Sequence, residues 1–130
     1  MISERRYRLI DKIAGWAVFI IAMLTYMLTL EPTVSYWDCG EYVAQAAMLE
    51  VGHPPGNPIF MLAGRVFCNF ASDVTQLALM VNAMSGVLSA LTILLLYWTI
   101  TMLVSRFCKK ESGYSLASVI AIVGSGVVGS

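Results

Sequence analysis

Two long apolar stretches divide the chain, and a polar segment lies between them. The first covers residues 13–30 and the second covers residues 74–104. A helix of about 18 residues, at about 1.5 Å per residue, nearly crosses a hydrocarbon core of about 30 Å. The pattern therefore predicts two transmembrane helices. A cleaved signal peptide is the alternative for the first, but its apolar run is longer than the roughly 7–15 residues of a signal core.

Local signals mark where these stretches begin and end. Glu31-Pro32 closes the first one, because proline disfavours helix in the residue before it. Asp73 and Gln76 have the spacing of a capping box ahead of the second. A third apolar run, residues 114–130, is too short to span and predicts the truncated start of a third transmembrane helix.

Composition and charge support a membrane location and give an orientation. The chain is 58% hydrophobic and 12% charged, whereas a soluble domain carries roughly 25% charged residues. Apart from Arg65, all basic residues flank the two stretches on one side: Arg5, Arg6, Arg8, Lys12, Arg106, Lys109 and Lys110. The positive-inside rule makes residues 1–12 and 105–113 cytoplasmic and residues 31–73 external. No basic run with interleaved aromatics suggests a nucleic-acid partner.

The external segment holds two acids that a helix would bring together. Ser35 and Asp38 have capping-box spacing and predict a helix that starts near one of them and runs to about Val51, with Gly52 as its stop. Its helical periodicity places Asp38, Glu41, Tyr42 and Gln45 on one face. From spacing alone, a capping role for Asp38 is favoured over catalysis, and both interpretations stay open.

The proline-rich segment after this helix predicts a stiff turn and a second helix. Proline fixes φ, so residues 53–58 cannot be helical. Asn57 can cap the next helix with Pro58 at its first position. That helix, residues 59–70, is too short to span and is predicted to lie at the membrane interface.

The other candidate residues each allow a structural interpretation beside a functional one. His53 is more readily explained by a turn-stabilising hydrogen bond than by ligand binding. Arg65 is more often a snorkelling side chain than a ligand of a lipid phosphate, and Trp37 more often an interfacial anchor than a sugar-stacking ring. Cys39 and Cys68 could form a disulfide, although free thiols are favoured, and no cysteine pair has metal-site spacing.

Three motifs together resemble a known family. The sequence W-D-C-G-E-Y at residues 37–42, followed by L-E-V-G-H-P-P-G-N-P at residues 49–58, is similar to a D-S-G-E … L-G-x-x-H-P-P-G-Y-P signature. That signature belongs to a bacterial multi-pass membrane family related to vertebrate transmembrane protein O-mannosyltransferase. The stretch N-A-M-S-G-V-L-S-A at residues 82–90 resembles the family's N-x-x-S-A-x-x-x-A-L helix. The resemblance covers roughly residues 1–106, and it departs at Cys39, where serine is common, and at Asn57, where tyrosine is common.

The resemblance implies a fold and an activity. The fold is all-α and integral to the membrane, the N-terminal part of a GT-C type glycosyltransferase in the bacterial inner membrane, with its active face periplasmic. Such enzymes move a sugar, here expected to be mannose, from a polyprenyl-phosphate donor to a protein or glycan hydroxyl. Asp38 matches the acid at their active site, and Glu41 follows it. Some relatives hold a divalent metal with such acids and others do not, so a metal cofactor stays open.

These implied roles fit elementary chemistry. A carboxylate can accept the proton of an acceptor hydroxyl, and the leaving phosphate needs cationic or hydrogen-bonding stabilisation. The candidate substrate-binding residues are His53, Arg65, Asn57 and Trp37. The alternative is a non-catalytic module that packs or tethers a larger membrane assembly. A transporter ranks last, because the two spans contain no ionisable residue at mid-membrane depth.

Overall fold

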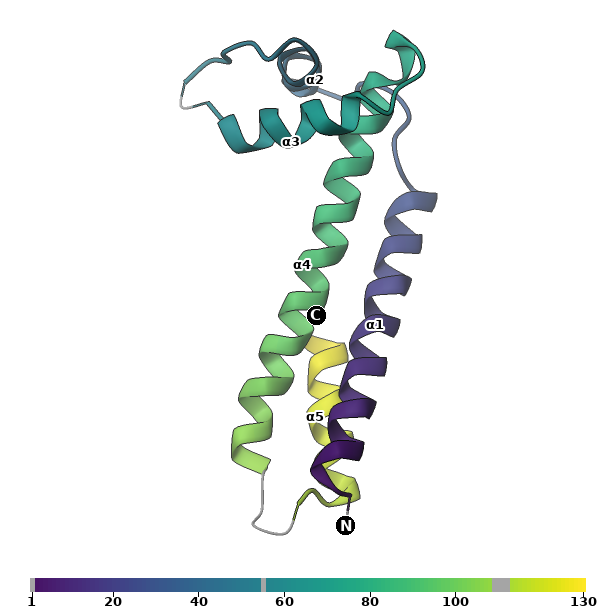
Figure 1. The fold of residues 1–130 in the computed structure, drawn as a ribbon, viewed down its shortest axis with the longest axis vertical. Helices are drawn as coiled ribbons and strands as arrows, with labels where there is room; N and C mark the ends of the chain where they lie inside the picture. Colours follow the sequence, from purple (N-terminus) through teal and green to yellow (C-terminus); the bar gives the residue numbers. More distant parts are fainter. Residues whose placement is uncertain (1, 55, 109–112) are drawn as a thin grey trace. The chain divides into compact units, whose positions relative to one another are not determined.

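Helices joined by short loops make up the part of the chain that the structure describes. The computed structural model describes residues 2–54, 56–108 and 113–130. Figure 1 shows its elements, which are α1 (Glu4–Leu28), α2 (Cys39–Met48), α3 (Pro58–Cys68), the short 3₁₀ helix η1 (Val74–Gln76), α4 (Leu77–Cys108) and α5 (Leu116–Gly129). An isolated antiparallel bridge pairs Ile2 with Tyr114. The predicted all-α class is confirmed for these ranges.

Two stretches are long and apolar enough to cross a membrane, α1 and the continuous stretch Val74–Cys108 of η1 and α4. α1 begins well before residue 13 but ends at Leu28, short of the predicted end at residue 30, whereas the second stretch continues past residue 104. The apolar pattern marks the part of a helix that lipid would cover and not its ends. α1 begins at Glu4, whose carboxylate pairs with Arg8 one turn later at 2.8 Å. α5 has 14 residues and is too short to span by itself. Lys109 and Lys110 lie outside the described residues.

The helix starts show how capping operates in this chain. Asp73 is extended, with φ −149° and ψ 158°, and its carboxylate accepts a hydrogen bond from the Val74 amide at 2.6 Å. The Gln76 side chain reaches back and accepts from the Ser72 amide at 3.0 Å. Asp73 is therefore the cap, but it accepts from the first helical residue and Gln76 accepts from the residue before the cap, so the two reciprocal bonds of the predicted capping box are not formed.

The chain divides into two compact units, and the first comprises the residues up to Thr25 and from Ser89 onward. Its helices approach closely at small residues. A methyl group built on Gly15 would lie 2.6 Å from the Trp98 indole nitrogen, so only glycine fits between α1 and α4 there. Tyr97 is fully buried, and its hydroxyl donates to the Asp11 carboxylate at 3.3 Å.

The second unit, Tyr26–Leu88, contains the predicted external segment. α2 packs on α3, and the α2–α3 seam is tightest where Gly64 meets the fully buried Ala46. The Asn82 amide donates to the backbone carbonyls of Glu31, at 2.9 Å, and Thr33, at 3.2 Å. Asn82 therefore joins the start of the predicted external segment to α4.

Candidate functional site

The candidate site lies on α2 and on the loop that follows it, within the second unit. Asp38 occupies the N-cap position of α2, but its backbone has φ −75° and ψ 0° and its side chain makes no capping bond. A capping side chain reaches the helix amides from an extended backbone. The predicted Ser35–Asp38 capping box is therefore wrong. The exposed Asp38 carboxylate is left without a bond to its own helix.

The turn before Asp38 explains this backbone conformation. Trp37 adopts a left-handed φ of 62°, which is unusual for a residue with a side chain and costs about 1–2 kcal/mol. The turn is closed by a weak bond from the Cys39 amide to the Tyr36 carbonyl at 3.4 Å. The Trp37 side chain is 93% exposed, so the turn presents its ring outward.

α2 ends earlier than predicted, and Gly52 has a different role. Leu49 takes the left-handed conformation that closes the helix, with φ 56°, and the Glu50 amide bonds to the Gln45 carbonyl at 3.1 Å. The predicted stop at Gly52 is therefore wrong. The Gln45 side chain is buried against Gly52, where an added methyl group would lie 2.6 Å from the Gln45 amide nitrogen.

The loop brings His53 onto the Glu41 carboxylate. The His53 Nδ1 lies 2.9 Å from both Glu41 oxygens, and the His53 backbone amide donates to one of them at 3.3 Å. The Gln45 side-chain amide donates to the same oxygen, Oε1. Because Nδ1 is engaged with Glu41, the Nε2 edge of the ring is the edge left for a ligand.

Each member of this pair favours the charged form of the other. The hydrogen bond to Glu41, together with the Glu41 charge, raises the pKa of His53, and the Asp38 charge contributes in the same direction. The hydrogen bond from the His53 ring is the main cause that lowers the pKa of Glu41. His53 is thus held as an imidazolium to higher pH than an isolated histidine would be. Both side chains are partly exposed, at 51% for His53 and 40% for Glu41.

An aromatic ring connects the pair to α3. The Tyr42 ring lies 6.4 Å from the His53 ring and 5.8 Å from the Phe60 ring, edge to face with the latter. Such contacts contribute about 0.5–1.5 kcal/mol beyond area burial. The His53 ring is therefore located by Glu41 and by α2–α3 packing together.

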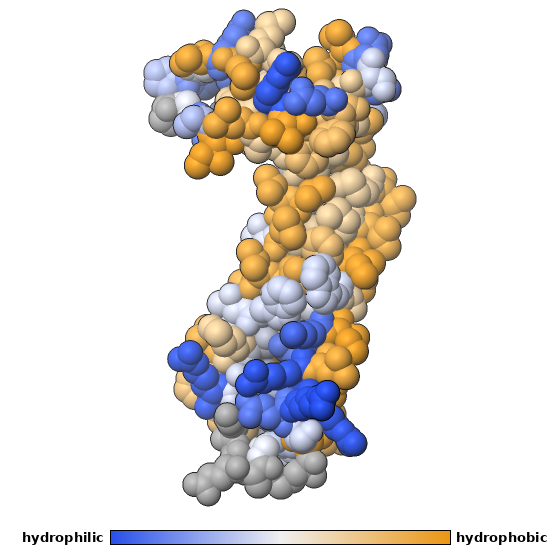
Figure 2. Space-filling view, in the orientation of Figure 1, coloured by the Kyte–Doolittle hydropathy of each residue, from blue (hydrophilic) through white to orange (hydrophobic). Residues whose placement is uncertain are grey.

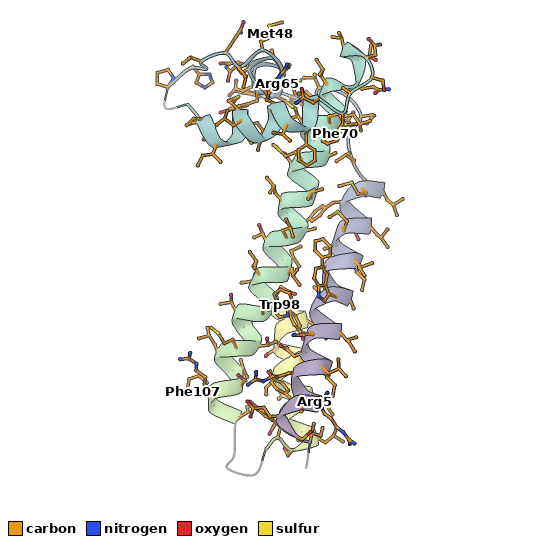
Figure 3. All side chains as sticks on the ribbon, in the orientation of Figure 1. Arg5, Met48, Arg65, Phe70, Trp98 and Phe107 are labelled. Atoms are coloured by element: carbon orange, nitrogen blue, oxygen red, sulfur yellow. The ribbon has the colours of Figure 1, made fainter. Side chains whose placement is uncertain are left out.

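The remaining predicted residues do not converge on this pair. Arg65, labelled in Figure 3, donates from its guanidinium to the Ala47 backbone carbonyl in the last turn of α2. A cation at a helix C-terminus is favoured by the unpaired carbonyls there. Asn57 is at the N-cap of α3 without a side-chain capping bond, with Pro58 at the predicted first position. Asn57 lines a neighbouring groove of about 480 Å³.

The residues do not make up a metal site by themselves. Within the described ranges, no three His, Cys, Asp or Glu side chains gather where they could hold a metal ion. Glu41 is already bonded to His53 and Gln45. Cys39 and Cys68 are free thiols, as favoured from the sequence.

Sequence reasoning missed the part played by Gln45 and Gly52. Gln45 stands four residues after Glu41, a spacing at which helical side chains interact, and this signal was available. The contact of Glu41 with His53 joins residues twelve apart and depends on the path of the loop. Nothing in the spacing of the two residues reveals it.

Comparison with known proteins gives the class of the protein first. Two curated relatives are each named a protein O-mannosyl-transferase TMEM260. One, from Dictyostelium discoideum, is 30% identical over 99 residues, which are 75% of this chain and 12% of the relative. The other, from Mus musculus, is 34% identical over 103 residues, which are 78% of this chain and 14% of the relative. The chain is thus related to glycosyltransferases, and with its two long apolar helices this indicates a membrane location.

The family follows from a more specific match. Residues 38–130 match the model of the protein O-mannosyl-transferase TMEM260 N-terminal domain. The chain belongs to this family. The matched range begins at Asp38 and includes the whole candidate site apart from Trp37. No solved structure matches the chain.

Proposed function

We propose that the chain is the N-terminal part of an inverting glycosyltransferase of the GT-C type. The complete enzyme would move mannose from a polyprenyl-phosphate donor to a hydroxyl of a protein or glycan. The relatives' names support sugar transfer. The observation that carries the proposal is that the Asp38 side chain makes no bond to its own helix, while Glu41, three residues further on, holds the His53 imidazole.

In this mechanism Asp38 acts as the general base. The acceptor hydroxyl oxygen attacks C1 of the sugar while its proton passes to the Asp38 carboxylate. The bond between C1 and the phosphate oxygen breaks, and the electron pair leaves with the lipid phosphate. A carboxylate that also capped its helix would have less capacity to accept this proton.

His53 supports the leaving group. Its Nε2–H donates a hydrogen bond to the phosphate oxygen on which negative charge develops, and the Glu41 partner keeps the ring charged. Glu41 is assigned to hold and charge His53, because its oxygens are occupied by His53 and Gln45. The catalytic role expected for Glu41 is thereby exerted through the histidine.

The other substrate-binding residues receive more limited roles. The exposed Trp37 ring offers a face for stacking on a sugar. Asn57 is exposed beside the apolar groove and offers hydrogen bonds to the donor. Arg65 acts chiefly by joining α3 to the last turn of α2, and its other guanidinium donors face the surface.

The site is proposed to work at the external face of the membrane, from the distribution of basic residues along the sequence. The bacterial inner membrane, expected from the loop signature, stays a prediction, and both relatives named above are from eukaryotes. The chain spans 12–14% of the length of those relatives. Under this proposal further helices of the complete enzyme bind the donor lipid, and the chain alone is expected to be inactive.

The test is mannose transfer by the complete protein from a lipid-linked donor. Asp38→Asn removes the base and is expected to lower the rate by about 10²–10⁴-fold. Glu31→Gln removes another exposed acid of the same segment, one that does not line the groove beside Asn57, and serves as the matched control, with its rate unchanged. A fully active Asp38→Asn enzyme would refute the proposed mechanism and favour the non-catalytic packing or tethering module.

A further inference from the structure

A strongly basic face at the start of α1 has no part in the proposed site. The side chains of Arg5, Arg6 and Lys12 are exposed. With Arg8, Ser3 and Leu9 they line a hollow of about 600 Å³. Figure 2 shows hydrophilic surface gathered at this end of α1, where Figure 3 labels Arg5. No acidic side chain is among the described residues that line the hollow.

The two acids of the same segment, Glu4 and Asp11, each have a partner. The Glu4 carboxylate pairs with Arg8 at 2.8 Å. Asp11 accepts the Tyr97 hydroxyl bond and lines a different hollow. The positive charge of the basic hollow is therefore reduced mainly at Arg8.

An apolar stripe continues from the hollow along the same side of α1. Leu9, Ile13, Trp16 and Ile20 are between 49% and 62% exposed. Their spacings of four, three and four residues place them on one helix face. Arg5 stands one turn before Leu9, and Lys12 stands one turn before Trp16. The basic residues therefore lie at the N-terminal end of this stripe.

We propose that this face of α1 binds one anionic phospholipid, with its phosphate in the basic hollow and its acyl chains along the apolar stripe. One arginine guanidinium can donate two parallel hydrogen bonds to a phosphate, and a lysine ammonium adds a compact positive charge. Free phosphate has the same headgroup chemistry but makes no contact with the stripe. The continuity of hollow and stripe therefore favours a lipid.

The experiment places the full chain in phosphatidylcholine vesicles that contain either spin-labelled phosphatidylglycerol or spin-labelled phosphatidylcholine. Electron spin resonance then gives the relative association of the two labels. The wild-type chain is expected to prefer phosphatidylglycerol about fivefold, the factor that one basic residue near a membrane surface supplies. The variant Arg5→Gln/Arg6→Gln/Lys12→Gln is expected to lose this preference, and circular dichroism checks its helix content.

A matched variant separates this site from general positive charge. Arg106→Gln removes a basic residue that lies outside the hollow, and it should keep the wild-type preference. The proposal is overturned if the triple variant keeps the preference or if Arg106→Gln loses as much. If the triple variant does not insert, Arg5→Gln/Lys12→Gln is measured against the same control.

A further arm distinguishes lipid from free phosphate. Inorganic phosphate and sodium chloride are added at equal ionic strength to the wild-type vesicles. Inorganic phosphate is expected to weaken the phosphatidylglycerol preference more than sodium chloride does, because it also competes for the guanidinium groups, but the acyl-chain contacts with the stripe should preserve part of the preference. Complete loss of the preference in inorganic phosphate, with the preference kept in sodium chloride, would overturn the assignment to lipid.

Discussion

Gly64→Ala tests how α2 is held on α3. Gly64 is buried in the α2–α3 seam, and a methyl group there would lie 2.8 Å from the fully buried Ala46 methyl carbon. Two methyl carbons in contact prefer about 3.5–4.0 Å, so the helices must separate by about 1 Å. The obstacle is a short side chain fixed to a helix, which cannot rotate away. Overpacking of this kind costs about 1–3 kcal/mol.

The loss of stability caused by Gly64→Ala is measured relative to the same substitution at a second glycine of the same unit. Replacing a helical glycine by alanine stabilises a helix by up to about 1 kcal/mol when the space is open. Gly40 is such a case, because its added methyl would meet only Val34, at an ordinary 3.5 Å. Gly40→Ala should therefore raise the free energy of unfolding. The free energy of unfolding of Gly64→Ala should be about 1–3 kcal/mol lower than that of Gly40→Ala.

The assay is denaturant unfolding of the full chain in detergent micelles, followed by far-ultraviolet circular dichroism. The two variants differ from wild type by the same chemical change, so the comparison isolates the contact with Ala46. If Gly64→Ala proves as stable as Gly40→Ala, α2 does not pack on α3 as described, and the location of the Glu41–His53 pair loses its support.

Three further predictions follow from the described contacts. Glu41→Gln should lower the pKa of His53, observed by NMR of the single histidine; an unchanged pKa contradicts the pairing. The Glu41–His53 pair should stabilise the wild-type chain most between about pH 4.5 and 6.5. The contribution of Glu41 is lost as pH falls through its lowered pKa, and the contribution of His53 is lost as pH rises through its raised pKa. Equal free energies of unfolding for wild type and Glu41→Gln at pH 5.5 would contradict this prediction. Asn82→Leu should lower the free energy of unfolding by about 1 kcal/mol through loss of the bonds to Glu31 and Thr33, and a value at or above wild type counts against them.

The fold was predictable where hydrophobic length decides the structure. Residues 13–28 of the first predicted stretch lie in α1, and the second stretch, 74–104, is covered by η1 and α4, because a run of apolar residues long enough to cross lipid has few other stable conformations. The helix ends were less predictable. α1 starts at Glu4 because nothing in its polar first turns breaks a helix.

Capping shows why sequence spacing has limits. Asp38 and Asp73 both precede helices, yet only Asp73 caps with its side chain. The difference lies in ψ, which is 158° at Asp73 and 0° at Asp38. The turn through Trp37 accompanies the value at Asp38, and no residue type in that turn announces a left-handed φ.

The candidate site was predictable in its residues more than in its arrangement. The shared helix face of Asp38 and Glu41 came from periodicity. The contact with His53 requires a loop that crosses Gln45 at a glycine, which is a tertiary feature. The bond from the Arg65 guanidinium to the Ala47 carbonyl was not predictable from spacing, because it depends on the unpaired end of α2 lying beside α3.

Chemical rescue tests the role of Asp38 most directly. In the complete protein, Asp38→Ala should stop mannose transfer from the lipid-linked donor, and added formate should restore part of the rate by supplying a carboxylate to accept the acceptor's proton. The same formate should not restore Asp38→Asn, whose side chain fills the space. Full transfer by Asp38→Ala without formate would contradict Asp38 as the base.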